Sequence, residues 1–187
     1  MNFTFKVVVA GPFASGKTTM IAASSDDPLV GTEAPTTGEE AVVKAMTTVG
    51  MEFGTLRHES DGLTVELSLY GVPGQERFSF MWDIVSVGMD GFFLLVDASR
   101  PETWQTSANI GEHFRGQSSC PIVVGINRAG DDTEVIEKVQ NEVPIPGATY
   151  ITFDVVSPTS AQNALAELLL LMLEAELLGP AANEMAA

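Results

Sequence analysis

Basic residues and cysteines are scarce in this chain of 187 residues. Lys and Arg together number 9 against 25 Asp and Glu, which gives a formal net charge of −16. This balance argues against binding to nucleic acid or to an anionic membrane surface through general electrostatic attraction. Cys120 is the single cysteine, so an intrachain disulfide is excluded. One cysteine suits the reducing conditions of a cytoplasm.

Long apolar segments and targeting signals are also missing. The longest apolar run covers residues 168–173, is flanked by Glu167 and Glu174, and is far too short to span a bilayer. The first residues lack the basic region of a secretory signal, and no cysteine near the C-terminus could be prenylated. We therefore expect a cytoplasmic protein with no membrane anchor of its own, recruited to a membrane only through a partner.

A phosphate-binding motif stands near the N-terminus. Residues 11–18 read Gly-Pro-Phe-Ala-Ser-Gly-Lys-Thr, between an apolar run expected to form a strand and a segment of helix formers. This setting is the one the G-x-x-x-x-G-K-[ST] motif requires. Loop N–H groups would face the α- and β-phosphates, Lys17 would reach the β/γ oxygens, and the Thr18 hydroxyl would ligate Mg²⁺. The predicted nucleotide contacts are Gly11, Phe13, Ala14, Ser15, Gly16, Lys17, Thr18 and Thr19.

Strands and helices alternate along most of the chain. Strands are predicted over residues 3–9, 49–56, 63–69, 91–97, 121–126 and 148–153, with helices over 17–24, 78–88, 101–114, 132–140 and 160–178. Asp61-Gly62 predicts a tight hairpin turn. The pattern predicts an α/β P-loop fold, with a six-stranded, mostly parallel sheet, one antiparallel hairpin and five helices. We expect one domain over residues 1–179 and a short mobile tail over 180–187.

Residues 69–78 read Leu-Tyr-Gly-Val-Pro-Gly-Gln-Glu-Arg-Phe. Together with the phosphate loop they resemble the Ras-like small GTPases, whose Rab members carry Asp-Thr-Ala-Gly-Gln-Glu-Arg-Phe here. The resemblance extends over about residues 7–173. It implies that Gly74 gives its N–H to the γ-phosphate and that Gln75 orients the attacking water.

A third run, residues 48–53, is similar to the Rab sequence Thr-Ile-Gly-Val-Asp-Phe. In the family this threonine ligates Mg²⁺ and touches the γ-phosphate, which implies Thr48 as the second protein ligand of the metal. Thr36, Thr37 and Thr47 are alternatives.

Three departures from the family pattern affect activity. Gly71 replaces the aspartate that supports Mg²⁺, so either looser metal binding or a different supporting group is expected. Phe13 stands where the family usually has a small residue, and its ring would crowd Gln75 and slow hydrolysis. In the base-reading motif Asn127 is retained, Arg128 replaces lysine, and Asp131 lies one position beyond the expected aspartate. Guanine preference is implied on the condition that this loop bulges.

These departures resemble a narrower group, the small GTPases of actinobacterial conservon operons, with gliding-motility GTPases more distant. Residues 77–82, Arg-Phe-Ser-Phe-Met-Trp, match that group's second switch. The resemblance implies roadblock-type and sensor-kinase-like membrane partners. The apolar residues of this segment either face such a partner or pack within the domain.

Taken together, the motifs predict a GTP/GDP switch with slow, Mg²⁺-dependent hydrolysis, in which Lys17 and Gln75 act catalytically. Two alternatives stay open. One is a nucleotide-bound scaffold with negligible turnover, and the other is an ATP-binding protein of the same fold.

Overall fold

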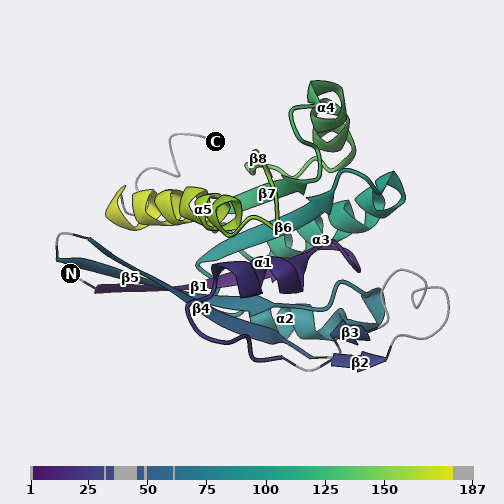
Figure 1. The fold of residues 1–187 in the computed structure, drawn as a ribbon. Coiled ribbons are helices and arrows are strands. Elements are labelled where there is room, and N and C mark those ends of the chain that lie inside the picture. The colour runs from purple at the N-terminus through teal and green to yellow at the C-terminus, as the bar shows by residue number, and fades with distance from the viewer. Residues whose placement is uncertain (1, 32, 36–45, 49, 61, 179–187) are drawn as a thin grey trace.

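The structure, a computed structural model, describes residues 2–31, 33–35, 46–48, 50–60 and 62–178. A six-stranded sheet in the order β4-β5-β1-β6-β7-β8 forms its centre (Figure 1). Only β4 runs antiparallel to its neighbour, and the other pairs are parallel. The strands are β1 (Asn2–Ala10), β4 (Glu52–Ser60), β5 (Leu63–Gly71), β6 (Gly91–Asp97), β7 (Ile122–Asn127) and β8 (Thr149–Phe153).

Five helices cover the two faces of this sheet (Figure 1). On one face lie α1 (Lys17–Ser24) and α5 (Pro158–Leu178), and on the other α2 (Phe80–Ser86), α3 (Trp104–Gln117) and α4 (Thr133–Glu142). Short 3-10 turns, η2 (Glu76–Phe78) and η3 (Pro101–Thr103), precede α2 and α3. The predicted α/β fold, with its single antiparallel hairpin and five helices, is confirmed.

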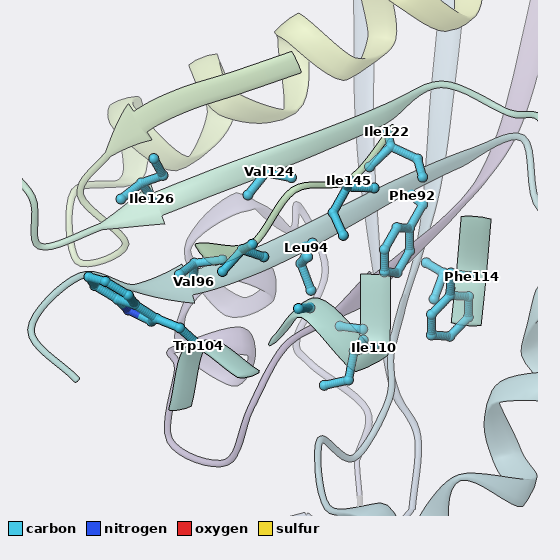
Figure 2. Packing of buried hydrophobic residues seen from close by; sticks show 14 of the residues in the cluster. Phe92, Leu94, Val96, Trp104, Ile110, Phe114, Ile122, Val124, Ile126 and Ile145 are labelled. Carbon is cyan, nitrogen blue, oxygen red and sulfur yellow. The ribbon is translucent and has the colours of Figure 1, made fainter. Parts of the chain in front are cut away.

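The centre of the sheet is apolar on both faces, as its sequence requires. Every residue of β6 and β7 is buried. Alternate side chains of β6 point to opposite layers, so Phe92, Leu94 and Val96 meet α3 (Figure 2) while Phe93 and Leu95 meet α5. The rings of Phe92 and Phe114 stack with centroids 4.4 Å apart. Burial on both sides explains why these strands read as unbroken apolar runs.

The edge of the sheet differs from expectation. The strand predicted over 49–56 instead covers Glu52–Ser60, and a separate two-stranded ribbon of β2 (Glu33–Pro35) and β3 (Met46–Thr48) was not predicted. Neither segment has the long apolar run that marks the central strands, so their bounds leave a weaker signal in the sequence. Among the described residues, no helix has the length and apolarity needed to cross a bilayer. The predicted tail lies outside the described residues.

The parallel strands bring four chain segments to one edge. At their carboxyl ends, β1 leads into residues 11–16, β5 ends at Gly71, β6 at Asp97 and β7 at Asn127. β4 and β5 lie on one side of β1, and β6, β7 and β8 lie on the other. The order in which the strands are added to the sheet therefore changes direction at β1. Ligands of doubly wound sheets bind at such a carboxyl-end crevice. The fold therefore gathers the phosphate loop, the 69–78 motif and the base-reading motif at one edge of the sheet.

Candidate nucleotide-binding site

The loop between β1 and α1 needs glycine at both ends. Gly16 has φ = +108° and is the N-cap of α1. A Cβ on Gly11 would lie 2.6 Å from the carbonyl oxygen of Leu95 on β6. Neither position tolerates a side chain without a shift of backbone. The loop is consequently held against the sheet in the tight form that a phosphate cradle requires.

The amino end of α1 has the properties of an anion site. No side chain caps it, and no acidic residue stands in its first turn. Lys17 places its Nζ 2.9 Å from the carbonyl oxygen of Gly11 and 2.8 Å from that of Pro12, so the ammonium lies across the loop. Unsatisfied helix N–H groups and a nearby ammonium favour a phosphate. Ser15 is buried, Thr18 half-buried and Thr19 exposed.

Two buried polar atoms at this site have no hydrogen-bond partner among the described residues. They are Oγ of Ser15 and Nδ2 of Asn127. Asn127 is fully buried, and its Oδ1 accepts a hydrogen bond from the N–H of Val155 at 3.2 Å. A buried donor without an acceptor is costly, and a ligand that supplies one removes the cost. The residues present therefore fit a bound nucleotide.

The second motif is packed directly on the phosphate loop. A Cβ on Gly74 would lie 1.9 Å from the carbonyl oxygen of Gly11 and 2.8 Å from the carbonyl carbon of Pro12. Gln75 follows, is 9% exposed, and accepts a hydrogen bond from Nη2 of Arg77 at 3.0 Å. The structure thus brings Gly74 and Gln75 to the loop that carries Lys17.

A cavity of about 400 Å³ opens beside this contact. Phe13 and Gln75 both line it, together with Arg100, whose Nη1 donates to the carbonyl oxygen of Phe13 at 3.0 Å. Arg100 also pairs with Glu102 at 3.1 Å. Sequence reasoning did not identify Arg100, because only the fold brings the segment after β6 to the phosphate loop.

A buried carboxylate lies beside the proposed metal ligand. The hydroxyl of Thr18 donates to Oε1 of Glu52, which is 2% exposed and is the register partner of Gly71. Among the described residues no group of three His, Cys, Asp or Glu side chains converges on one point. The Thr18 hydroxyl is the group through which a phosphate loop of this motif holds Mg²⁺. Sequence reasoning missed Glu52.

The residues of the base-reading motif differ in exposure, since Asn127 is buried whereas Arg128 and Asp131 are exposed. Arg128, with φ = +64°, pairs with the 1% exposed carboxylate of Asp97. That carboxylate also accepts from the N–H and Oγ of Ser99, at 3.0 and 2.6 Å. Asp131 is exposed and follows Gly130, which has φ = +57°. Whether Asp131 reads a base stays a prediction.

Thr48 belongs to the two-stranded ribbon and not to the six-stranded sheet. Its backbone ends β3 and pairs with Glu33 of β2, outside the six-stranded sheet, and Thr47 pairs with Ala34. The side chains of Thr47 and Thr48, and Thr36 and Thr37 altogether, lie outside what the structure describes. The role of Thr48 in metal binding stays a prediction.

The sheet order, the phosphate loop and the second motif packed on it define a P-loop protein of the small-GTPase class. The chain belongs to the Ras family, whose model matches residues 6–165. It is similar to the Ras-related protein YPTC6 of Chlamydomonas reinhardtii, with 22% identity over 173 residues, covering 90% of this chain and 74% of that protein.

Two further similar proteins are also named as Ras-related. RABA4c of Arabidopsis thaliana is 25% identical over 142 residues, which cover 76% of this chain and 58% of the plant protein. RabC of Dictyostelium discoideum is 25% identical over 150 residues, which cover 80% and 65%. The chain thus spans little more than half the length of RABA4c.

Proposed function

We propose that this protein is a GTP/GDP switch that hydrolyses GTP slowly with Mg²⁺. The observation that supports the proposal is the close approach of Gly74 to the phosphate loop, where an added Cβ would lie 1.9 Å from the carbonyl oxygen of Gly11. Membership of the Ras family supports it further.

Each part of the site has its own role in binding or hydrolysis. Loop N–H groups and Lys17 stabilise negative charge on the phosphates. Gln75 holds the attacking water, because its amide can accept from water and donate to a phosphoryl oxygen at once. Thr18, with Thr48, would hold Mg²⁺, which when bound neutralises charge on the β- and γ-phosphates. Asn127, Arg128 and Asp131 would surround the guanine base.

Slow turnover follows from the crowding beside Gln75. Phe13 lines the same cavity as Gln75, and a ring there would limit the space left for the attacking water. An activator that supplies an arginine in trans would add about 10³–10⁵-fold. The same observation favours a second candidate, a nucleotide-bound scaffold with negligible hydrolysis. An ATP-binding protein of this fold is the remaining alternative, and it rests on the altered base-reading motif.

Single-turnover hydrolysis with Gln75→Leu distinguishes the switch from the scaffold. GTP-loaded protein is incubated with Mg²⁺, and the bound nucleotide is resolved by ion exchange over time. The proposal expects a rate at least ~10-fold below that of the wild type. Gln140→Leu is the matched control, since Gln140 is exposed on α4. Equal rates for Gln75→Leu and the wild type would refute the switch mechanism.

We also propose a bacterial signalling role, close to the conservon-type GTPases, in the cytoplasm with recruitment to the membrane through a partner. The match of residues 77–82 to that group supports this assignment. Trp82 is buried and donates to the carbonyl oxygen of Pro73 at 3.1 Å, whereas Phe80, Ile84 and Val87 are 62%, 65% and 73% exposed. This exposed face of α2 suits a roadblock-type partner.

The partner proposal is tested by binding of a purified roadblock-type protein to wild type and to Ile84→Glu. Binding lost only in the variant supports a docking role for α2. If the wild type and Ile84→Glu bind the roadblock-type protein equally well, the contact does not involve this face of α2.

A further inference from the structure

Gly71 has no carboxylate, but Glu52, the residue opposite it, has one. Glu52 begins β4, Gly71 ends β5, and the two are register partners in the antiparallel ladder. Side chains of residues directly opposite each other lie on the same face of a sheet. Glu52 is 2% exposed, so its carboxylate is enclosed at this end of the sheet.

The space that a side chain at position 71 would need is already occupied. A Cβ on Gly71 would lie 2.8 Å from Oε2 of Glu52 and 2.6 Å from Cδ1 of Ile21 on α1. An aspartate at position 71 and the present position of Glu52 therefore exclude each other. The missing side chain of Gly71 and the buried carboxylate of Glu52 belong to one arrangement.

The carboxylate also touches the residue through which a P-loop holds its metal. The Thr18 hydroxyl donates its proton to Oε1 of Glu52. A hydroxyl that donates in this direction keeps its lone pairs available for a cation. Partners that orient a metal ligand in this way raise metal affinity, typically by about 10–100-fold.

A carboxylate beside the phosphate loop also favours a bound cation. Two carboxylate oxygens beside the phosphate loop repel a bound phosphate, and burial strengthens that repulsion because little water screens it. A divalent cation held through Thr18 would offset this repulsion.

We propose that Glu52 supplies, from β4, the carboxylate that orients Mg²⁺ through Thr18, in place of the aspartate that Gly71 lacks. This inference rests on the proposed function as a Mg²⁺-dependent guanine-nucleotide switch. Glu52 is here a positioning residue for the metal.

The test measures release of a fluorescent GDP analogue while free Mg²⁺ is titrated, so its readout is metal-dependent retention rather than hydrolysis. Glu52→Gln keeps the shape and removes the charge. We expect the Mg²⁺ midpoint to rise by about 10–100-fold, with no faster release in EDTA. Glu59→Gln is the matched control, since Glu59 is exposed on the same strand. An unchanged midpoint in Glu52→Gln overturns the inference.

A second pair of variants guards against a folding defect. Glu52→Ala should also raise the Mg²⁺ midpoint, and adding Gly71→Asp to it should lower the midpoint again, since the carboxylate returns to the family's position. A double variant no better than Glu52→Ala counts against the inference. If the wild type retains no guanine nucleotide at any Mg²⁺ concentration, the proposed function itself fails.

Discussion

Replacing Gly74 by alanine tests the contact between the second motif and the phosphate loop. The added Cβ would lie 1.9 Å from the carbonyl oxygen of Gly11, whereas Cβ contacts in proteins essentially never fall below 3.0 Å. The neighbouring atoms in Gly11 and Pro12 belong to the backbone, so no side-chain rotation relieves the overlap. The two segments must separate.

The size of the shift sets the expected effect. Moving from 1.9 Å to 3.0 Å requires about 1.1 Å of separation. Gln75 is the next residue and moves with Gly74. A misplacement of about 1 Å costs on the order of 10²-fold in rate, which corresponds to roughly 2.7 kcal/mol of barrier. Lys17 and α1 are unchanged, so the variant should still retain GDP.

Single-turnover hydrolysis of bound GTP, followed by ion exchange over hours, measures the loss. Gly116→Ala is the control, because Gly116 lies in α3 with no atom within 4 Å of an added Cβ. It should hydrolyse GTP at the wild-type rate and melt slightly higher, since Ala stabilises a helix by about 0.5–1 kcal/mol over Gly. Wild-type turnover in Gly74→Ala would refute the reasoning.

Three further outcomes are expected. Phe13→Ala should raise the single-turnover rate, on the order of tenfold, because Phe13 shares its cavity with Gln75; an equal or lower rate contradicts the crowding. Asn127→Ala should lower stability by about 1–3 kcal/mol, seen as a lower melting temperature, because the N–H of Val155 loses its acceptor; unchanged melting contradicts this. Burial raises the pKa of the Cys120 thiol, so the reactive thiolate forms only at higher pH. Alkylation with iodoacetamide should be slower than for free cysteine near pH 8 and rise with pH; equal rates would contradict the burial.

The interior of the fold could be predicted from sequence because burial fixes it. The predicted bounds of the helix 17–24 and the strand 91–97 agree with α1 and β6 to the residue. A phosphate-loop motif marks the start of the helix, and an unbroken apolar run marks the strand. The β2–β3 ribbon was not predicted, because strands of three residues are too short to show a periodic pattern.

Site residues could be predicted where one continuous motif contains them. They could not be predicted where the site depends on contact between two separate segments. Lys17 and Thr18 follow from one motif, whereas Glu52 acts only through its place opposite Gly71. A signal for it did exist. The turn that Asp61-Gly62 predicts would pair Ser60 with Leu63. Counting back along both strands then pairs Glu52 with Gly71, which is the register that the structure has. Applying that register would have placed a carboxylate where the family's aspartate is missing.

The central claim, a guanine-nucleotide switch, is tested most directly by identifying the nucleotide that freshly purified protein releases on denaturation. Ion exchange against standards separates the candidates. We expect GDP, from guanine binding followed by completed hydrolysis. Recovered GTP would point to the scaffold with negligible turnover, and an adenine nucleotide would contradict the guanine assignment made for Asn127, Arg128 and Asp131.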